Sequence, residues 1–319
     1  MSRGQGTRRE LNQLAENLFE DEATRQAFVD AIQAQESREG ALILLQDRPE
    51  IRAFPQYRPM SWQPPFIVRL MQGFKASQHP LYAQGAFYSL DFSSVIAASV
   101  MLAIEPAPKR ILDLCASPGG KSVFAARAFA PDVIICNESL RRRTGILIEN
   151  LTRCRVKGAN VSSADASVWA RKASQAFDFV IVDAPCSGQS LLAKGREAPG
   201  CFDPAMLDVC VGRQRRILAH ALECTAPGGH VLYMTCTFNR KENERVIEWA
   251  MRQFEGVEAV EAPAMAVFRS HLADVPCYRL FPQQGLGAGM FSALLRKPGS
   301  PIELPALSDE LPIFWRSDG

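Results

Sequence analysis

Two cysteines occupy positions in which a thiol can act as a nucleophile. Cys186 lies in Asp183-Ala-Pro-Cys-Ser-Gly188 and Cys236 in Tyr233-Met-Thr-Cys-Thr-Phe238, and each follows an apolar run that predicts a strand. A lone cysteine is most often a small buried apolar residue. A thiolate near basic groups or a helix N-terminus is instead a strong nucleophile. Because ligands of an open α/β sheet lie beyond the carboxyl ends of its strands, we expect both thiols to face one crevice.

A turn with two glycines follows another predicted strand. Its residues are Cys115, Ala116, Ser117, Pro118, Gly119, Gly120 and Lys121. The glycines let the backbone approach a ligand closely, and the N-terminus of the next helix favours anionic groups. The turn is neither the Gly-x-Gly-x-x-Gly fingerprint nor a P-loop.

Acidic residues follow the next strands, with Glu138 after the second, Asp165 after the third and Asp183 after the fourth. An acid after the second strand of a nucleotide-binding sheet bonds the hydroxyls of a ribose. Any one of these acids can be a simple cap, but the set predicts a site for an adenosine-containing ligand. The nine cysteines contain no Cys-x-x-Cys pair, so we expect no metal site.

Positioning these residues requires strands and helices that alternate. We expect strands at 110–115, 133–137, 160–164, 177–183, 230–235, 277–281 and 290–296, and helices at 121–130, 204–225 and 241–254, with a basic helix after 137. Such alternation predicts a parallel sheet covered by helices on both faces.

The ends of the chain differ from this pattern. Leu11, Leu14 and Leu18 recur at helical spacing, whereas residues 49–65 are rich in Pro and aromatic residues and predict irregular structure or short strands. We expect an N-terminal domain over 1–78, a catalytic domain over 79–298 and a tail over 299–319. Within the tail, Ile313-Phe314-Trp315 can dock back on the body.

Composition excludes several classes of protein. The 319 residues are 47% hydrophobic and 22% charged, which is typical of a globular chain and not of a disordered one or a coiled coil. No apolar run approaches the roughly 18–20 residues that span a bilayer. The polar start, Met1 to Arg9, lacks the apolar stretch of a signal peptide. We therefore expect a cytoplasmic protein with reduced thiols and no membrane partner; a monomer is favoured.

The net charge of +2 conceals local asymmetry. Residues 10–39 contain eight acidic and two basic residues, and residues 139–158 contain six basic residues and one acidic residue. The basic ones are Arg141, Arg142, Arg143, Arg153, Arg155 and Lys157. A strip of this density can attract phosphates, although most such strips are solvated helix faces.

The motifs in their order resemble the Nop/Sun-type (RsmB/RsmF-like) RNA cytosine methyltransferases. The resemblance is carried by Asp113-Leu-Cys-Ala-Ser-Pro-Gly-Gly-Lys121, Asp183-Ala-Pro-Cys-Ser-Gly188 and Thr235-Cys-Thr237, with His79-Pro-Leu-Tyr-Ala-Gln-Gly-Ala-Phe-Tyr88 before them and Arg279-Leu-Phe-Pro282 and Gly289-Met-Phe-Ser-Ala293 after them. It covers residues 79–298 and implies a Rossmann-like class I methyltransferase fold, a doubly wound α/β sheet, with a small, mainly helical N-terminal domain.

The resemblance also implies roles for residues of this chain. S-adenosylmethionine would be held by the turn from Cys115 to Lys121, by Glu138, Asp165 and Asp183, and by Arg143. Cys236 would attack carbon 6 of a cytosine in RNA, so that carbon 5 accepts the methyl group. Asp183 would hydrogen-bond the ring nitrogen, and Cys186 would help to remove the proton from carbon 5 or to release the enzyme.

Some residues depart from the family pattern. Ser117 replaces the usual Ala, and Gly195 follows Lys194 where an acidic residue is common. Arg38 begins a segment that occupies the place of an Arg-x-Asn signature. Residues 299–319 are too few for the further RNA-binding domain of many bacterial members, so we expect RNA selection to depend on the N-terminal segment, the basic helix or a partner.

Three readings remain open from the sequence. The favoured one is methylation of RNA at cytosine carbon 5, with ribosomal RNA preferred over transfer RNA. A second is methylation of another polynucleotide such as DNA, for which Cys186 would be the nucleophile. A third is an adenosine-binding scaffold without catalysis, against which the presence of both cysteines argues.

Overall fold

The central sheet is parallel in its middle and antiparallel at its edges. In the computed structural model, which describes residues 3–35 and 40–317, the strand order is β10-β11-β8-β7-β4-β5-β6-β12. The strands are β4 (Arg110–Asp113), β5 (Val133–Asn137), β6 (Ala159–Ser162), β7 (Phe177–Asp183), β8 (Thr225–Thr235), β10 (Tyr278–Leu280), β11 (Met290–Arg296) and β12 (Ile313–Arg316), and the two-residue β9 (Glu258–Ala259) pairs with β11. The expected parallel sheet is therefore confined to the five strands from β8 to β6.

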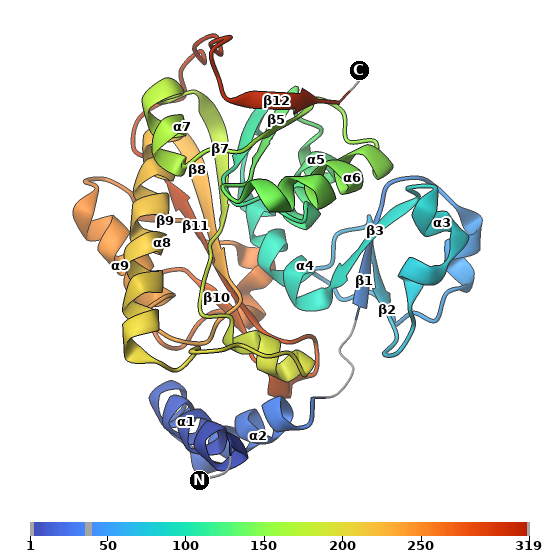
Figure 1. The fold of residues 1–319 in the computed structure, drawn as a ribbon, viewed down its shortest axis with the longest axis vertical. Coiled ribbons are helices and arrows are strands. Elements are labelled where there is room, and N and C mark those ends of the chain that lie inside the picture. Colours follow the sequence, from blue (N-terminus) through green and yellow to red (C-terminus); the bar gives the residue numbers. More distant parts are fainter. Residues whose placement is uncertain (1–2, 36–39, 318–319) are drawn as a thin grey trace.

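Helices cover both faces of this sheet (Figure 1). One side carries α4 (Phe92–Ser99), α5 (Gly120–Phe129) and α6 (Thr144–Arg153), and the other carries α7 (Ala166–Lys172), α8 (Pro204–Cys224) and α9 (Glu244–Gln253).

Strand β7 shows why the sheet buries both faces. Successive side chains of a strand point to opposite sides. Phe179 and Ile181 lie in the apolar core on one side, and Val180 and Val182 in the core on the other. An uninterrupted apolar run is the pattern that a strand covered on both faces requires.

The N-terminal region contains helices and a second, smaller sheet. The helices α1 (Arg3–Leu18) and α2 (Glu22–Gln33) agree with the expected helical segment. The strands β1 (Gly40–Leu44), β2 (Ile67–Leu70) and β3 (Phe87–Asp91) pair antiparallel in the order β2-β1-β3. A boundary at residue 78 would pass through this sheet, since β3 lies beyond it. Arg38 lies outside the described residues.

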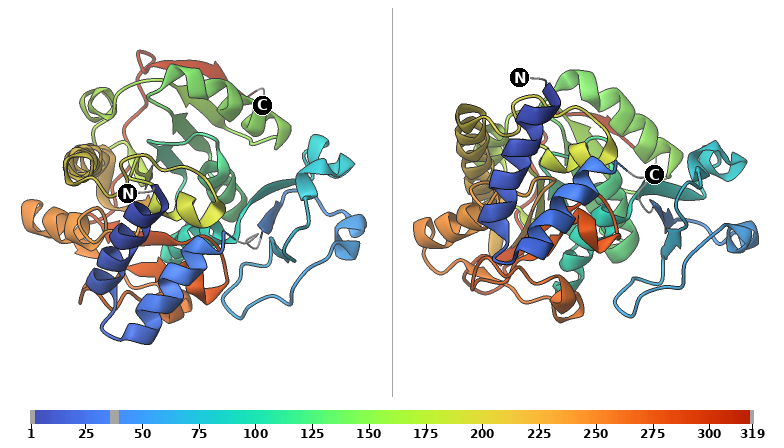
Figure 2. Two further views of the ribbon diagram at one scale, coloured as in Figure 1. Left: turned by 60° about the horizontal axis from the view of Figure 1, so that its bottom comes forward. Right: turned by 90° about the horizontal axis from the view of Figure 1, so that it is seen from below.

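The two N-terminal helices pack away from the small sheet, against the loops at one end of the large sheet (Figure 2). Phe28 of α2 lies 5.1 Å from Phe238 and 6.1 Å from Phe281, measured between ring centroids. Phe19 lies 4.8 Å from the ring of Phe281. These aromatic contacts make α1 and α2 part of the surroundings of the loop that follows β8.

The C-terminal segment docks on the sheet as expected. β12 pairs antiparallel with β6 and covers that edge, and the guanidinium of Arg141 stacks over the ring of Phe314 at 3.5 Å from its centroid. Among the described residues, no helix has both the length and the apolar character to cross a membrane.

Candidate active site

The candidate catalytic residues lie at the carboxyl ends of neighbouring parallel strands. Asp113, the last residue of β4, is paired with Cys136 of β5 and with Ile181 of β7. Asp183, the last residue of β7, is paired with Met234 of β8. The glycine turn and the loops that carry the two thiols therefore all leave the sheet at the carboxyl ends of its parallel strands, as the sequence predicts.

The two thiols meet in a direct contact. The Sγ atoms of Cys186 and Cys236 are 3.3 Å apart, and Cys236 is exposed whereas Cys186 is half-buried. The hydrogen bond with Cys186 lowers the pKa of Cys236, as do the cations of Lys121 and Lys194, against the opposing effects of burial and of the charge of Asp183. The same contact, together with burial and the charge of Glu242, raises the pKa of Cys186. Cys236 is thus the thiol that ionises first.

A lysine and an acid face each other beside Cys236. Lys121 Nζ lies 2.8 Å from Asp183 Oδ2, and the Asp183 side chain keeps 33% of its exposure. Burial alone would lower the pKa of Lys121, but the nearby Asp183 raises it overall. Lys121, expected only to hold the cofactor, therefore also orients the acid that is expected to meet the base.

The glycine turn is held by a buried carboxylate. Asp113 is fully buried; it accepts hydrogen bonds from Ser122 Oγ at 2.7 Å and from the Cys115 N–H at 3.2 Å. Burial raises its pKa to about 7. Gly119 has φ of +114°, and a Cβ on Gly120 would approach the Tyr88 ring to 3.1 Å. The positive φ thus favours glycine at position 119, and a side chain at position 120 would have to displace the Tyr88 ring by a few tenths of an ångström.

Glu138 and Arg143 lie against this turn. The Arg143 guanidinium pairs with Glu138 Oε2 at 3.1 Å and donates to the Ser117 carbonyl at 2.8 Å. The Ser117 hydroxyl donates in return to the Arg143 carbonyl at 3.0 Å. Glu138 is nearly buried and also accepts from the Leu140 N–H at 2.9 Å. The residues expected around the ribose therefore form one connected group.

Asp165 is the most peripheral of the expected residues. Strand β6 ends at Ser162, so Asp165 does not directly follow it. Its carboxylate caps α7 by accepting from the Ser167 N–H at 2.9 Å, a contact that lowers its pKa. Asp165 is exposed, and the contact of its carboxylate with Ser167 serves the fold.

Comparison with known proteins identifies the family. The model of the 16S rRNA methyltransferase RsmB/F family matches residues 100–296. The chain belongs to this family. The ribosomal RNA small subunit methyltransferase F of Klebsiella pneumoniae (strain 342) is 32% identical over 231 residues, or 70% of this chain and 48% of that protein. That of Cronobacter sakazakii (strain ATCC BAA-894) is 29% identical over 264 residues, or 79% and 55%. The chain spans about half the length of these curated relatives.

Solved structures confirm the Rossmann-like methyltransferase fold. NSun6 from Pyrococcus horikoshii, determined with SFG, superimposes with a TM-score of 0.77 at 18% identity and covers 91% of this chain and 98% of that one. A methyltransferase homolog protein from the same organism gives a TM-score of 0.71 at 22% identity, covering 93% and 100%.

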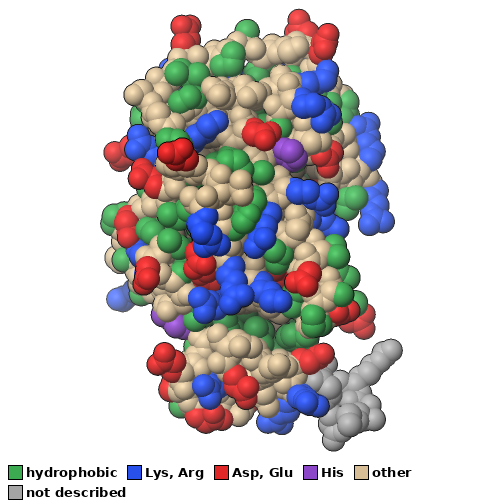
Figure 3. All heavy atoms as spheres, turned by 90° about the vertical axis from the view of Figure 1, so that its left-hand side faces the viewer, with side chains coloured by type: hydrophobic (Ala, Val, Ile, Leu, Met, Phe, Trp, Pro, Cys, Tyr) green, Lys and Arg blue, Asp and Glu red, His purple; other side chains and the backbone are tan. Residues whose placement is uncertain are grey.

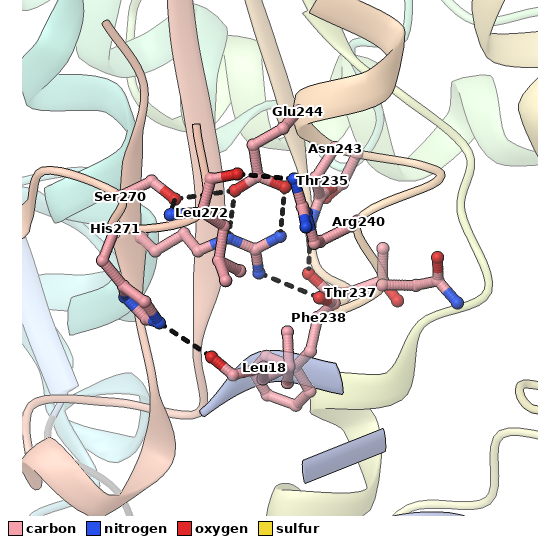
Figure 4. A network of polar contacts seen from close by, with 12 residues as sticks. Leu18, Thr235, Thr237, Phe238, Arg240, Asn243, Glu244, Ser270, His271 and Leu272 are labelled. Carbon is pink, nitrogen blue, oxygen red and sulfur yellow. Dashed lines mark hydrogen bonds and ion pairs between the residues drawn. The ribbon is translucent and has the colours of Figure 1, made fainter. Parts of the chain in front are cut away.

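The sequence did not reveal the polar residues that support the loops of the two cysteines in this RsmB/F family member. Asn243, just before α9, accepts from the Thr235 hydroxyl at 2.6 Å and donates to the Thr237 carbonyl at 2.9 Å. It therefore holds the residues on both sides of Cys236 (Figure 4). Glu244, beside it, binds the buried Arg279.

A second amide joins the two loops. Gln189, three residues after Cys186, accepts from the Thr237 hydroxyl at 2.9 Å and from the Phe238 N–H at 3.0 Å. Its side-chain nitrogen donates to the Cys201 carbonyl. For the acids and the amide at the start of α9, the only signal in the sequence was the polar run Lys241-Glu-Asn-Glu244. Such a run is equally typical of an exposed helix start, so the burial of these side chains could not be inferred.

The basic strip divides into structural and exposed residues. Arg153 donates to the carbonyls of Tyr82 and Phe87 at 3.0 and 3.1 Å and stacks on the Tyr82 ring. It therefore anchors the small sheet, whereas Arg155 and Lys157 are exposed. A different group of Lys and Arg side chains is visible on the face covered by α8 and α9 (Figure 3). Its helices contribute the exposed residues Arg213, Arg216 and Arg245.

A cavity of about 720 Å³ lies on the side of the sheet away from the thiols, at the amino ends of the parallel strands. Lys109, Asp132 and His230 line it together with part of the C-terminal segment, and none of the candidate catalytic residues does so. In the part of the chain that the structure describes, no group of three or more His, Cys, Asp and Glu side chains is arranged to hold a metal ion.

Proposed function

We propose that this chain transfers a methyl group from S-adenosylmethionine to carbon 5 of cytosine in RNA, with ribosomal RNA preferred over transfer RNA. The observation that carries the proposal is the pair of thiols, 3.3 Å apart at the ends of two adjacent strands. Cys236 is the more acidic thiol of the two. A covalent addition that must later be reversed benefits from two separate groups.

The residues around the glycine turn suit the proposed cofactor. Glycine at two positions allows close approach, and the nearly buried Glu138 supplies a carboxylate for ribose hydroxyls. The turn from Cys115 to Lys121, Glu138, Arg143, Asp165 and Asp183 would hold S-adenosylmethionine. When bound, this cofactor supplies an electrophilic methyl carbon. Membership in a methyltransferase family supports the same cofactor.

The residues of the chain would act in sequence on the cytosine ring. The thiolate of Cys236 would form a bond to carbon 6, and Asp183, which must carry a proton to do so, would donate a hydrogen bond to the ring nitrogen that gains electron density. Once carbon 5 has accepted the methyl group it must lose its proton, after which the bond between sulfur and carbon 6 breaks. Cys186 would assist the loss of the proton or the release of sulfur. The target base must leave its stack to reach the crevice.

Ribosomal RNA is favoured as the substrate because the curated relatives are small-subunit ribosomal RNA methyltransferases. The test is incubation of the protein with labelled S-adenosylmethionine and 16S rRNA, followed by bisulfite sequencing. We expect one cytosine to resist conversion only when active protein is present. Incorporation of label without a resistant cytosine would overturn carbon 5 as the acceptor, and RNA binding without incorporation would favour the scaffold.

A further inference from the structure

We propose that Glu242, a buried acid outside the expected catalytic set, is a positioning residue that keeps Cys186 a neutral thiol and thereby leaves Cys236 to act as the thiolate nucleophile. The proposal rests on the proposed function for its catalytic meaning. Its structural basis is a network that reaches the residues on both sides of Cys186.

Glu242 holds the loop of Cys186 through its neighbours. Its Oε2 accepts from the Ser187 N–H at 2.9 Å and from Gln214 Nε2 at 2.8 Å, and its Oε1 accepts from the Ser187 hydroxyl. Gln214 Nε2 also donates to the Pro185 carbonyl at 3.1 Å. The peptide groups before and after Cys186 are therefore both fixed to this acid or to its partner.

The charge of Glu242 has no cation against it. Glu242 and Gln214 are both fully buried, and within residues 3–35 and 40–317 no ion pair with Glu242 is found. Hydrogen bonds from an N–H, a hydroxyl and an amide stabilise the carboxylate without cancelling its charge. A negative charge held this way opposes the ionisation of a nearby thiol.

The groups that face the two thiols differ in sign. The contact with Cys236 and burial raise the pKa of Cys186 most, and the charge of Glu242, whose carboxylate binds the neighbouring Ser187 N–H, raises it further. Lys121 and Lys194 lower the pKa of Cys236, against the opposing charge of Asp183. Lys194 is held in place by Asp91, 3.1 Å away. The thiol pair thus lies between Glu242, which has no ion-pair partner among the described residues, and Lys121 and Lys194, each of which is paired with an aspartate.

This difference in the surrounding charges gives the two sulfurs different roles. A neutral Cys186 donates its proton as a hydrogen bond to Cys236, which stabilises the thiolate before attack and again when the sulfur leaves carbon 6. An ionised Cys186 could not donate, and two adjacent thiolates would repel each other. The two sulfurs lie 3.3 Å apart, within hydrogen-bond range for either direction of donation, and the charges around them favour Cys186 as the donor.

The experiment measures the pH dependence of alkylation by iodoacetamide, site by site, by mass spectrometry. In a Cys236→Ser background, Cys186 should react with a midpoint above the value of about 8.5 for an ordinary thiol. Adding Glu242→Gln should lower this midpoint by about one pH unit or more, the range expected for loss of one nearby like charge. The amide can keep the hydrogen bonds, because the Ser187 and Thr237 hydroxyls, 2.8 Å apart, can reverse their direction.

Ser187→Ala in the same background is the matched control. It removes a hydrogen bond to Glu242 and leaves the charge, so the midpoint of Cys186 should stay within a few tenths of a unit. Equal shifts in both variants would mean a structural effect and would overturn the proposal, as would an unchanged midpoint in Glu242→Gln. If Glu242→Gln fails to fold, a Cys186 midpoint at or below about 8.5 in the Cys236→Ser protein overturns it.

The assay needs neither RNA nor cofactor, so its outcome is independent of the proposed function. A shifted midpoint in a protein that never methylates RNA would refute the methyltransferase proposal and leave the role of Glu242 standing. Methylation of cytosine with an unshifted midpoint would support the methyltransferase proposal and refute the role of Glu242.

Discussion

At the scale of single residues, the two cysteines differ through their surroundings. Cys236 is exposed and near two lysines, and Cys186 is half-buried and near an acid. The pKa of the same side chain is therefore lowered at position 236 and raised at position 186. That difference allows the roles of the two residues to be separated by substitution.

We expect Cys236→Ala to abolish methyl transfer and to leave cofactor binding nearly unchanged, because Cys236 lies outside the glycine turn.

Cys186→Ala should accumulate a covalent complex of protein and RNA that survives a denaturing gel, because release loses its assisting group. Adducts that form only in Cys236→Ala would reverse the two assignments and favour the chemistry of DNA cytosine enzymes.

Asp113 predicts a pH dependence of stability. Its pKa is about 7 in the folded protein, against 3.8 for an ordinary solvated aspartic acid. The folded state therefore binds more protons than the unfolded state between these values, and the free energy of unfolding should fall as the pH rises through this window. One proton gives a slope of at most about 1.4 kcal/mol per pH unit.

Asp113→Asn should remove this contribution while keeping the hydrogen bonds to Ser122 and to the Cys115 N–H. Urea unfolding at several pH values measures the effect. A variant with the same decline between pH 4 and pH 7 as the unmodified protein would show that another group titrates there.

At the scale of elements, a buried ion pair ties α9 to β10. Arg279 Nη2 lies 2.6 Å from Glu244 Oε2, and neither side chain exposes more than 1% of its surface. Burial opposes the ionisation of Glu244, but Arg279 lowers its pKa overall. The start of α9 is thereby tied to β10, and Figure 4 shows Glu244 and Asn243 of this region near Thr235 and Thr237.

Arg279→Met should lower the free energy of unfolding by about 3–5 kcal/mol, because it leaves a buried carboxylate without a counter-charge. Arg296→Met is the matched control. It breaks an exposed pair with Glu258 and should cost less than about 1 kcal/mol. Equal losses in denaturant unfolding would contradict the difference in burial.

We expect the loop after α6 to contact RNA, with an affinity that depends on salt concentration. Reversing the charges of Arg155 and Lys157 should weaken RNA binding and flatten the plot of log affinity against log salt by about 0.7 per lost contact to a single strand. A second variant, in which the charges of Arg213 and Arg216 on the face of α8 are reversed, gives the comparison for RNA binding. An unchanged slope in the first variant would make its residues ordinary solvated surface.

At the scale of the whole molecule, α1 and α2 close the catalytic end of the domain. Their apolar residues form one cluster with Phe238, Phe281 and Ala193. Phe238 is two residues after Cys236, and Ala193 belongs to the loop after Cys186. The N-terminal helices therefore support both catalytic loops from outside, although they lie far from them in the sequence.

Phe28→Ala should cost about 3–5 kcal/mol of unfolding free energy, since Phe28 is fully buried between Phe238 and Phe281. We also expect slower methyl transfer with little change in cofactor affinity, because the glycine turn lies at other strands. Phe314→Ala, at a ring that is 39% exposed, is the control with a small expected cost. A stable Phe28→Ala protein would show that the helices are not part of the core.

The sequence alone determined the alternating strands and helices, the order of the motifs, and hence the family. Those features are local, because apolar runs, glycine turns and residues next to them can be read along the chain. Only the tertiary structure showed that Glu242, Asn243 and Gln189 hold the thiol loops, that Lys121 faces Asp183, and that Arg153 is an anchor. A polar residue at a helix start looks the same whether it is solvated or buried, and the distinction depends on distant segments that fold over it.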